Sequence, residues 1–496
     1  MTTQRRYRSH AGEHVVWLNF RDSAHPLAGG AEVFMHAVAR RLVREGQRVT
    51  VVTARPRGMK RTETVDGVTV RRMGSSYTVY LLALLWVLVH RRQINAIVDT
   101  CNGVPFFSPL AVGRQVPVVV LIHHVHQTMF AQHLPRPVAS VARWVERVGN
   151  RKVYGRRTVA VVSPSSRSEV RRVLGLAGPL YVATNGQEPI EVAGVDRSVN
   201  PRIVVVGRLV PHKRWELLVR AMPRVAEILP HVELHLVGDG PCRARLEALV
   251  DEIGLRDRVW LHGRLPAEDR DRLLATSWLT VCTSEVEGWG LAVTEAMSLG
   301  IPAVVLAAPG LRDSVRNRVS GWVVPDPGLL AARLTDALIE LDDPAAARDW
   351  AQRCRAWSAR FAWNATADRM ASLLMHEDCR RMKADRRAVC DLATVVEMPI
   401  EQAILIDYRG LRSVDQIDWE EPGSAPASVR LLLAGFDECD AAALLHRCGL
   451  DTSSITARVA RPTDLVGWKR TGGPRAYDLQ AYFQQYAAVT GMRRVS

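Results

Sequence analysis

Residues 14–54 have the sequence HVVWLNFRDSAHPLAGGAEVFMHAVARRLVREGQRVTVVTA, in which two apolar runs enclose a polar loop and an amphipathic segment. Phe34, Val38 and Leu42 fall on one helical face, and Gly46 supplies the stop signal behind them. The order strand, loop, helix, strand is typical of the opening unit of a nucleotide-binding sheet. We therefore expect a parallel sheet covered by helices.

The same alternation continues along the chain. Short apolar runs recur at AIVDT, PVVVLIH, TVAVVS and LYVATNG, each bounded by Gly, Pro, Ser or Asn, as buried parallel strands should be. After a polar linker near 191–200, a second series begins with RIVVVGRL. The predicted class is α/β, with two Rossmann-like doubly wound domains facing across a cleft and an accessory domain behind them. The predicted bounds are 1–190, 191–377 and 378–496, and the helix WNATADRMASLLMHE that ends the second domain is expected to pack back on the first.

The basic residues are unevenly distributed. Residues 1–190 hold 27 Lys and Arg against 10 Asp and Glu, whereas residues 191–496 hold 39 against 41. This one-sided charge favours an anionic partner, which is a phospholipid surface, a lipid phosphate acceptor or a nucleic acid. Charge alone does not choose among them.

The chain has 8 cysteines without a C-x-x-C pair, and its Arg-rich start resembles no cleavable signal, so we expect a reduced cytoplasmic setting. The longest apolar run, Val79 to Val89, is much shorter than the ~20 residues of a spanning helix. We expect it to form a buried helix.

The strongest chemical signal is SEVEGWGLAVTEAMSLGIPAV, residues 284–304. Gly288, Trp289 and Gly290 precede an apolar helix that begins at Leu291, and its free amides and dipole should attract a diphosphate.

Two carboxylates flank this helix start. Glu295, one turn inside the helix, is placed to accept both hydrogens of a ribose diol, and Glu287, in the loop, to reach sugar hydroxyls. The structural alternative is that Glu287 only caps the helix and Glu295 is solvated.

Further candidates follow two other strands. Arg208 and Lys213, in GRLVPHKRWELL, are two cations suited to a diphosphate leaving group. The turn LAGGAE, with Gly29 and Gly30, lets backbone approach a phosphate or sugar closely, although a plain tight turn would look the same.

VVVLIHHVHQ places His123, His124 and His126 at a strand end, where a neutral imidazole would hydrogen-bond a sugar hydroxyl or orient the acceptor. Zinc is disfavoured because H-x-H without a further nearby ligand is poor metal spacing.

The order of GGAE, the strand-end histidine, VSPSS, TNG, GRL with Lys, GDGP, HGRL and EGWGLAVTEA resembles the GT4 family of retaining glycosyltransferases, whose fold is GT-B. The resemblance covers about residues 14–375. It implies that Arg208 and Lys213 bind the diphosphate, Glu295 the ribose and Glu287 and His123 the transferred sugar. It also implies that Gly29, Gly30, Gly207, Gly288, Trp289, Gly290 and Leu291 contact the donor, and that Gly263, Arg264 and Leu265 hold the base through backbone groups.

The family retains anomeric configuration without a clear enzymic nucleophile, and no carboxylate here is an evident nucleophile. We expect front-face attack in which the departing phosphate takes the acceptor's proton. No D-x-D follows a strand, so no metal is expected, and the GDP- or UDP-linked hexose, of mannose or glucose type, is a substrate rather than a cofactor.

The acceptor is expected on the N-terminal domain. Its segment Val141 to Arg157 is basic and amphipathic, which suits docking on anionic lipid at the inner membrane face, although a solvated helix has the same pattern. A lipid-linked or envelope-glycan acceptor follows from that hypothesis.

Two other functions are weighed against this one. An NAD-dependent oxidoreductase or epimerase needs a complete glycine fingerprint and an acidic residue closing the second strand, where Ala54 and Arg55 stand instead. A nucleic-acid-binding protein would explain the positive charge, but no binding motif accompanies it, so no nucleic-acid partner is expected.

Overall fold

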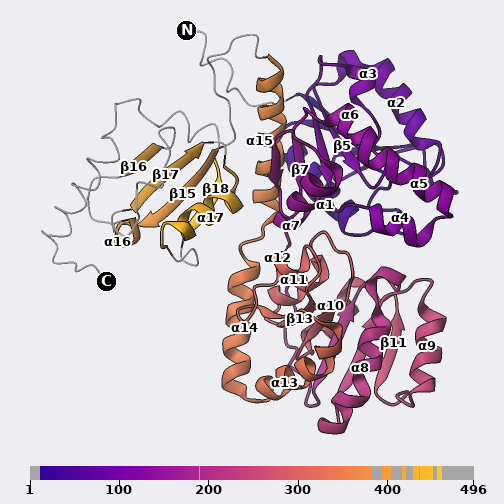
Figure 1. Cartoon of the computed structure of the whole chain (residues 1–496), viewed down its shortest axis with the longest axis vertical. Coiled ribbons are helices and arrows are strands. Elements are labelled where there is room, and N and C mark those ends of the chain that lie inside the picture. Colours follow the sequence, from indigo (N-terminus) through magenta and orange to yellow (C-terminus); the bar gives the residue numbers. More distant parts are fainter. Residues whose placement is uncertain are drawn as a thin grey trace, which may run out of the picture.

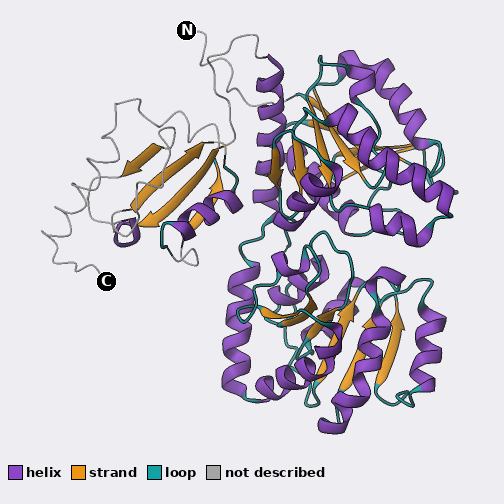
Figure 2. Cartoon of the chain, in the orientation of Figure 1, coloured by secondary structure: helices purple, strands orange, loops and turns teal. Residues whose placement is uncertain are grey.

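The computed structural model describes residues 12–188, 190–382, 393–403, 416–419, 428–434, 436–450 and 455–460. In this part of the chain, two α/β domains lie one above the other and a smaller sheet domain sits beside the first (Figure 1). Helices flank the central sheet in each of the two larger domains (Figure 2). The predicted α/β class with two Rossmann-like domains is confirmed.

The first domain is built on one eight-stranded sheet with the order β3-β4-β2-β1-β5-β6-β7-β8. All neighbouring strands are parallel except β3 and β4, which are antiparallel. Val and Ile dominate the central strands, which are buried because helices cover both faces. The strands are β1 (His14–Leu18), β2 (Arg48–Thr53), β3 (Thr62–Val65), β4 (Val68–Arg72), β5 (Ala96–Cys101), β6 (Val118–Ile122), β7 (Val159–Val161) and β8 (Leu180–Val182).

One face of this sheet is covered by α1 (Gly30–Arg44) and by α15 (Trp363–Met382), whose Met370 packs in the same core as Phe34 of α1. The chain therefore returns from the second domain to the first. The opposite core contains residues of α2, α3, α6 and η4. The remaining helices and turns of this domain are α2 (Val79–His90), η2 (Arg91–Gln93), α3 (Pro109–Val112), α4 (Gln127–His133), α5 (Arg136–Trp144), η3 (Val145–Gly149), α6 (Asn150–Tyr154), α7 (Pro164–Glu169) and η4 (Val170–Leu174).

Helix α2 differs from the sequence prediction. The apolar run does form a helix, but only Val79, Ala83 and Val87 are buried, while Leu81 is 61% and Leu85 48% exposed. The prediction of a buried helix is wrong for the outer side of α2. The run is apolar all round, so it has no periodicity that could reveal one exposed side.

The second domain has the strand order β11-β10-β9 and β12-β13-β14. A parallel bridge between Ile203 and Leu279 joins the two groups side by side. The strands are β9 (Arg202–Val206), β10 (Glu233–Val237), β11 (Val259–Gly263), β12 (Thr280–Cys282), β13 (Ala303–Leu306) and β14 (Gly321–Val324). The helices and turns are η5 (Pro211–Lys213), α8 (Trp215–Ile228), α9 (Arg243–Glu252), α10 (Ala267–Ala275), α11 (Leu291–Ser298), α12 (Leu311–Ser314), η6 (Pro327–Leu329), α13 (Leu330–Asp342) and α14 (Pro344–Ser358).

These strand orders explain where a site must form. In the first domain β1 lies between β2 and β5, and in the second β9 lies between β10 and β12. Successive connections turn in opposite directions at these strands. Each such position is the switch point of its sheet, and a crevice opens there at the carboxyl ends of the strands. The loops after β1 and β5 and those after β9 and β12 therefore converge.

The appended domain is an antiparallel sheet with the order β16-β17-β15-β18. Its element order is a split βαβ arrangement. The elements are β15 (Ala393–Pro399), α16 (Ile400–Ala403), β16 (Gln416–Trp419), β17 (Ser428–Ala434), α17 (Glu438–Arg447) and β18 (Thr456–Val459).

Asp437 attaches this domain to the first one. Its carboxylate accepts hydrogen bonds from the Val182 amide at 2.8 Å and from Arg167 at 3.0 Å, and it also caps α17. The Asp437 side chain is fully buried in this contact.

Candidate active site

A cleft of about 660 Å³ lies between the two α/β domains, at the carboxyl ends of their strands. Every predicted site residue except Gly263 lines it. The cleft brings together Gly29, Gly30 and His123 of the first domain with Gly207, Arg208, Lys213, Arg264, Leu265, Glu287, Gly288, Trp289, Gly290, Leu291 and Glu295 of the second.

Lys213 and Glu287 form an ion pair inside the cleft, with 2.6 Å between Lys213 Nζ and Glu287 Oε2. Lys213 comes from η5 and Glu287 from the loop after β12, on the two sides of the switch point. Burial opposes the charged form of both groups, but their mutual attraction prevails, so the pKa of Lys213 is raised and that of Glu287 is lowered. Both groups are therefore held charged where a donor would lie.

Arg208 follows β9 and has no side-chain hydrogen bond or ion pair with the residues that the structure describes. Its guanidinium lies near the backbone of Gly29, where an added Cβ would be 3.8 Å from Arg208 Nη2. Burial, followed by the neighbouring Arg21, lowers the pKa of Arg208. A cation held beside an open crevice without a partner is suited to an anionic ligand.

Helix α11 begins beside the Lys213–Glu287 ion pair, and its amino end has no side-chain cap. Its N-cap, Gly290, has φ +100°, a backbone conformation that favours glycine, and a Cβ there would lie 2.8 Å from Leu311 Cδ2. Glu287 does not cap the helix but pairs with Lys213. The Trp289 ring packs edge-on against Phe361, with centroids 4.9 Å apart, and is almost fully buried. The Trp289 indole thus packs in the interior although the residue borders the cleft.

Glu295 lies one turn inside α11 and borders the cleft. Its carboxylate makes no hydrogen bond or ion pair within the described residues, and burial raises its pKa. The acceptor oxygens of Glu295 are available to a ligand hydroxyl.

His123 is buried at the end of β6, and its Nε2 has no hydrogen-bond partner among the described residues. Burial, assisted by His124 and His126, lowers its pKa to about 3, so the ring is neutral. An unpartnered, neutral imidazole nitrogen at the cleft suits a hydrogen bond to a ligand. The described residues contain no group of three or more His, Cys, Asp or Glu placed to hold a metal ion, and this includes the three histidines here.

The turn at Gly29 and Gly30 is fixed by Glu32, whose Oε2 accepts a hydrogen bond from the Gly29 amide at 2.7 Å. A Cβ on Gly30 would come within 3.2 Å of Leu291 in the second domain. The turn therefore lies directly against the start of α11.

The loop after β11 is arranged differently from the expectation. Arg264 donates from Nη2 to the carbonyl of Pro26 at 2.6 Å, so its side chain crosses to the first domain. Gly263 itself accepts a backbone hydrogen bond from Gly238 and does not reach the cleft. A side-chain bridge between domains had no signal in the sequence.

The structure adds cleft residues that the sequence analysis did not single out. Arg21 after β1, Asn102 after β5 and Met129 of α4 line the first-domain side. Their common signal is position, because each lies in a segment after a strand of the first domain. They extend the site toward the side where the acceptor is expected.

His126 is backed by a buried carboxylate. Glu146, in η3, accepts a hydrogen bond from the His126 amide at 2.8 Å, and its Oε1 lies 3.6 Å from His126 Nδ1. Burial raises the pKa of Glu146 to about 7. The predicted basic segment 141–157 thus contributes one side chain that supports the cleft as well as an outer surface.

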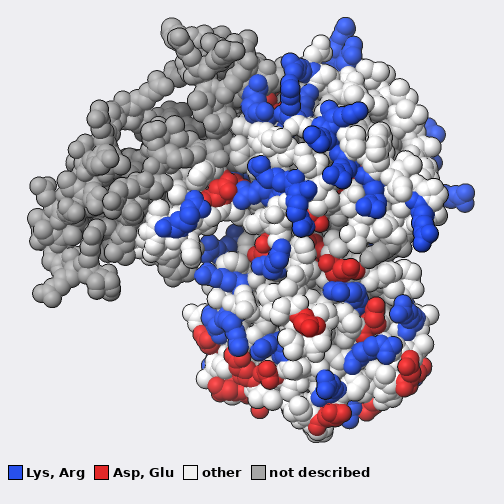
Figure 3. Space-filling view, viewed as in Figure 1, with Lys and Arg blue, Asp and Glu red and all other residues white. Residues whose placement is uncertain are grey.

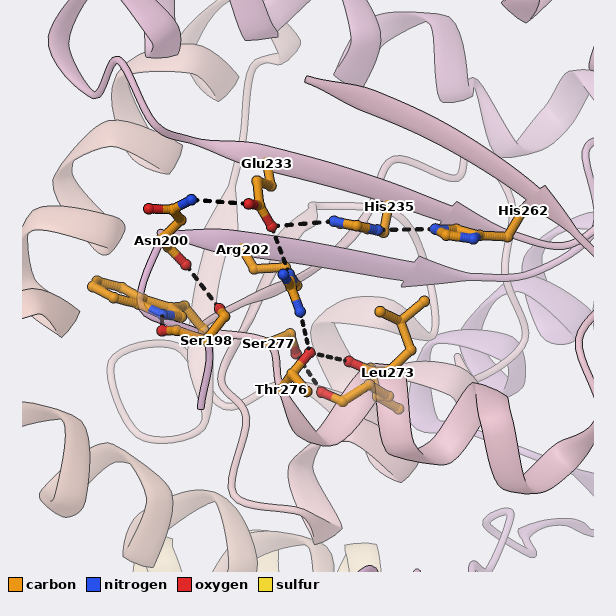
Figure 4. A network of polar contacts seen from close by, with 11 residues as sticks. Ser198, Asn200, Arg202, Glu233, His235, His262, Leu273, Thr276 and Ser277 are labelled. Carbon is orange, nitrogen blue, oxygen red and sulfur yellow. Dashed lines mark hydrogen bonds and ion pairs between the residues drawn. The ribbon is translucent and has the colours of Figure 1, made fainter. Parts of the chain in front are cut away.

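A second polar cluster lies at the amino ends of β9 and β10 (Figure 4). Glu233 accepts hydrogen bonds from Arg202 at 2.7 Å and from Asn200 at 3.0 Å, and the His235 and His262 rings are hydrogen-bonded at 2.9 Å. The cleft lining does not include these residues, and the hydrogen bond from Asn200 to Glu233 ties the linker to β10.

Two family profiles match the chain. The profile described as "Glycosyltransferase Family 4" matches residues 28–190, and the one described as "Glycosyl transferases group 1" matches residues 193–357. Together they span both sides of the cleft.

Several glycosyltransferases are similar to part of this chain. An alpha-D-kanosaminyltransferase of Streptomyces kanamyceticus is 28% identical over 59% of this chain and 81% of its own length. A 2-deoxystreptamine glucosyltransferase of the same organism is 30% identical over 55% and 71%. A GDP-mannose-dependent alpha-(1-6)-phosphatidylinositol monomannoside mannosyltransferase of Mycobacterium tuberculosis is 28% identical over 36% and 49%.

Solved structures share the fold. Sucrose-phosphate synthase from Thermosynechococcus elongatus superposes with a TM-score of 0.63 at 22% identity, over 74% of this chain and 100% of that one. The similarity extends over the two α/β domains as a pair.

Proposed function

The chain belongs to family 4 of the glycosyltransferases and transfers a hexose from a nucleotide sugar, and from this premise we propose a retaining, metal-independent reaction in the interdomain cleft. One observation carries the proposal. Two cations, two carboxylates and an uncapped helix start converge at the switch point of the second sheet.

The diphosphate of the donor would lie against Arg208, Lys213 and the free amides at the start of α11. When the bond between the sugar and the phosphate breaks, negative charge grows on the departing diphosphate. Cations that are already in place stabilise this charge without reorganising. No metal ion is required for that task, and the nucleotide sugar serves as substrate without a cofactor.

The nucleoside would be held by Glu295, whose free carboxylate accepts both hydrogens of the ribose diol, and by backbone groups around Leu265. Glu287 and the unpartnered Nε2 of His123 would then face the hexose hydroxyls. The loop after β11, whose Leu265 lines the cleft, would select guanine or uracil as the base of the donor.

The acceptor hydroxyl would attack the anomeric carbon from the side that the diphosphate leaves. The new C–O bond forms as the old one breaks, the electron pair goes to the phosphate oxygen, and that oxygen takes the acceptor's proton. Anomeric configuration is retained because entry and departure share one face. The chain's own contribution is alignment, electrostatic stabilisation and exclusion of water.

The acceptor would enter from the first domain, past Arg21, Asn102 and His126. We infer a lipid-linked or envelope-glycan acceptor, which one relative's name supports because that enzyme acts on a phosphatidylinositol mannoside.

Donor binding tests the proposal most directly. Thermal shifts are compared for GDP-mannose, UDP-glucose and UDP-N-acetylglucosamine, because a ligand that binds the folded state raises the melting temperature. The true donor should give the largest shift, and Glu295→Ala should abolish it. Glu268→Ala is the matched control, since this exposed α10 glutamate lies outside the cleft. Full donor binding by Glu295→Ala would refute the ribose assignment.

The stereochemistry is read from the product. Proton NMR of the glycoside should show the donor's anomeric configuration, and exhaustive chelation should leave the rate unchanged. Inversion of the anomeric configuration would contradict a retaining reaction. Loss of activity on chelation that a divalent cation restores would contradict metal independence.

A further inference from the structure

The outer helical layer of the first domain exposes an unusual amount of apolar side chain. On α2, Leu81, Leu85 and Leu88 follow the spacing i, i+4, i+7 and lie on one stripe, with Val89 76% exposed beside them. Isolated exposed apolar residues are ordinary, but a continuous stripe on one helix marks an interaction surface.

Helix α5 presents a similar stripe. Val138, Val141 and Trp144 are all more than half exposed, while Ala139 faces inward. Buried residues of α2, α3 and α6 belong to one core cluster, α2 packs on α3, and α3 contacts α6, which continues α5 (Figure 1). Both stripes therefore point away from the same face of the sheet.

This layer is basic and has no exposed acid. In residues 67–168, all of which the structure describes, the two carboxylates are Asp99 and Glu146, and both are buried. Arg91 and Arg92 follow the α2 stripe, and Arg143 and Arg147 flank the α5 stripe, all of them exposed. In the view of Figure 3, Lys and Arg predominate over the first domain, whereas both signs alternate over the second.

We propose that this surface, formed by the exposed sides of α2 and α5 with their flanking arginines, docks on an anionic phospholipid bilayer. Apolar stripes bordered by arginine match a lipid interface, where the side chains enter the headgroup boundary and the guanidinium groups meet lipid phosphates. A second copy of the chain fits less well, since it would bring two strongly positive surfaces together. None of the helices in the described part of the chain has the length and apolarity needed to cross a bilayer.

The surface is continuous with the acceptor side of the cleft. Met129 of α4 lines the cleft, and Gln127 of the same helix donates a hydrogen bond to the Arg143 carbonyl of α5 at 3.0 Å. Seating α5 on a bilayer would bring the mouth of the cleft to the headgroup region. The supply of a lipid-linked acceptor to the cleft rests on the proposed function. The docking of α2 and α5 on a bilayer does not depend on that function.

Vesicle flotation with the full chain tests the docking. Vesicles contain either phosphatidylcholine alone or equal parts of phosphatidylcholine and phosphatidylglycerol, at low and at high salt. We expect binding to the anionic vesicles at low salt and its loss at high salt. Absence of binding to anionic vesicles at low salt would overturn the proposal.

Two variants separate the contributions. Leu81→Gln with Leu85→Gln should weaken partitioning about tenfold, by loss of apolar insertion. Arg91→Gln with Arg92→Gln should weaken it about twenty-five-fold, at about fivefold for each arginine. The matched controls lie in the second domain: Ile228→Gln with Ile339→Gln, which are 59% and 52% exposed, and Arg272→Gln with Arg348→Gln. Equal loss in controls and variants would refute the surface assignment.

Light scattering distinguishes docking on a bilayer from a contact between two copies of the chain. If the leucine variants abolish a dimer of the full chain and leave vesicle binding intact, the surface is a contact between copies and the proposal fails. Donor thermal shifts of all variants should equal those of the unsubstituted chain, so a failure of docking is read separately from a failure of the transferase assignment.

Discussion

The two α/β domains share an architecture and differ in what they do with it. Both place loops at the carboxyl ends of parallel strands around a switch point, and both contribute to one cleft. The second domain gathers paired charges, an open helix start and a charge-balanced surface. The first domain supplies neutral histidines, a glycine turn, a basic surface and exposed apolar helices. The comparison teaches that the chemistry is concentrated in one domain and the surroundings of the acceptor are determined by the other.

Lys213→Ala should have the largest effect, because it removes a cation from the leaving diphosphate and leaves Glu287 without its partner at 2.6 Å. We expect kcat to fall about 10³-fold. The rate of nucleotide release at saturating donor concentration measures kcat. Lys60→Ala, an exposed lysine of the first domain, is the control and should retain full activity. A decrease of less than tenfold would mean that the chemistry does not depend on the second domain in the way proposed.

Asp437→Ala tests how firmly the first domain holds the appended one. The substitution leaves Arg167 and the Val182 amide without their buried acceptor, so we expect a loss of about 3 kcal/mol in unfolding free energy. Asp440→Ala removes the other half of the cap of α17 and the half-exposed ion pair of Asp440 with Arg167 at 3.0 Å. It keeps the buried Asp437 acceptor, so it should cost only about 1 kcal/mol. Denaturant titration checks both. Equal losses would show that the buried carboxylate of Asp437 contributes no more to stability than the more exposed carboxylate of Asp440.

Gly288→Ala probes the contact between the two domains. A Cβ on Gly288 would lie 2.6 Å from the His123 carbonyl oxygen, so the domains would have to separate. We expect kcat/KM to fall about tenfold to fiftyfold. Gly328→Ala is the control, because the nearest atom to its Cβ is at an ordinary 3.4 Å. Unchanged kcat/KM in Gly288→Ala would show that this close approach is not needed for catalysis.

The pH dependence of stability should reveal the neutral histidines of the first domain. Because burial lowers the pKa of His123 to about 3, the unfolded chain, with a pKa of about 6.5, binds the proton first. This contribution to stability is complete above pH 6.5 and is lost as the pH falls toward 3, by about 2 kcal/mol at pH 5. Between pH 7 and pH 5, the melting temperature of His123→Gln should therefore depend less on pH than that of the unsubstituted chain.

The control is His231→Gln, at an exposed position before β10. The melting temperature of this variant should depend on pH as steeply as that of the unsubstituted chain. A parallel pH profile for the two variants would contradict the buried, neutral state of His123.

The sequence predicted most of the second domain and less of the first. Arg208, Lys213, Glu287 and Glu295 lie in short segments next to apolar strands, and strand order alone brings these segments together. The same reasoning failed for α2, because an apolar run does not reveal which of its sides a neighbouring helix leaves uncovered.

Contacts between distant segments were also beyond a single sequence. Nothing in the local pattern around Arg264 indicated the carbonyl of Pro26, and nothing around Asp437 indicated the amide of Val182. Such contacts depend on how separate sheets meet, which apolar periodicity does not encode.

The position of β8 has a practical consequence. It is the last of eight strands, and its outer side would offer peptide groups to any neighbouring strand if Asp437 did not occupy one of them. A shortened protein ending at residue 377 would contain both halves of the cleft and yet expose this margin to self-association. Expression for crystallisation or enzyme engineering should therefore keep the chain through α17, even when only the sugar-transfer reaction is of interest.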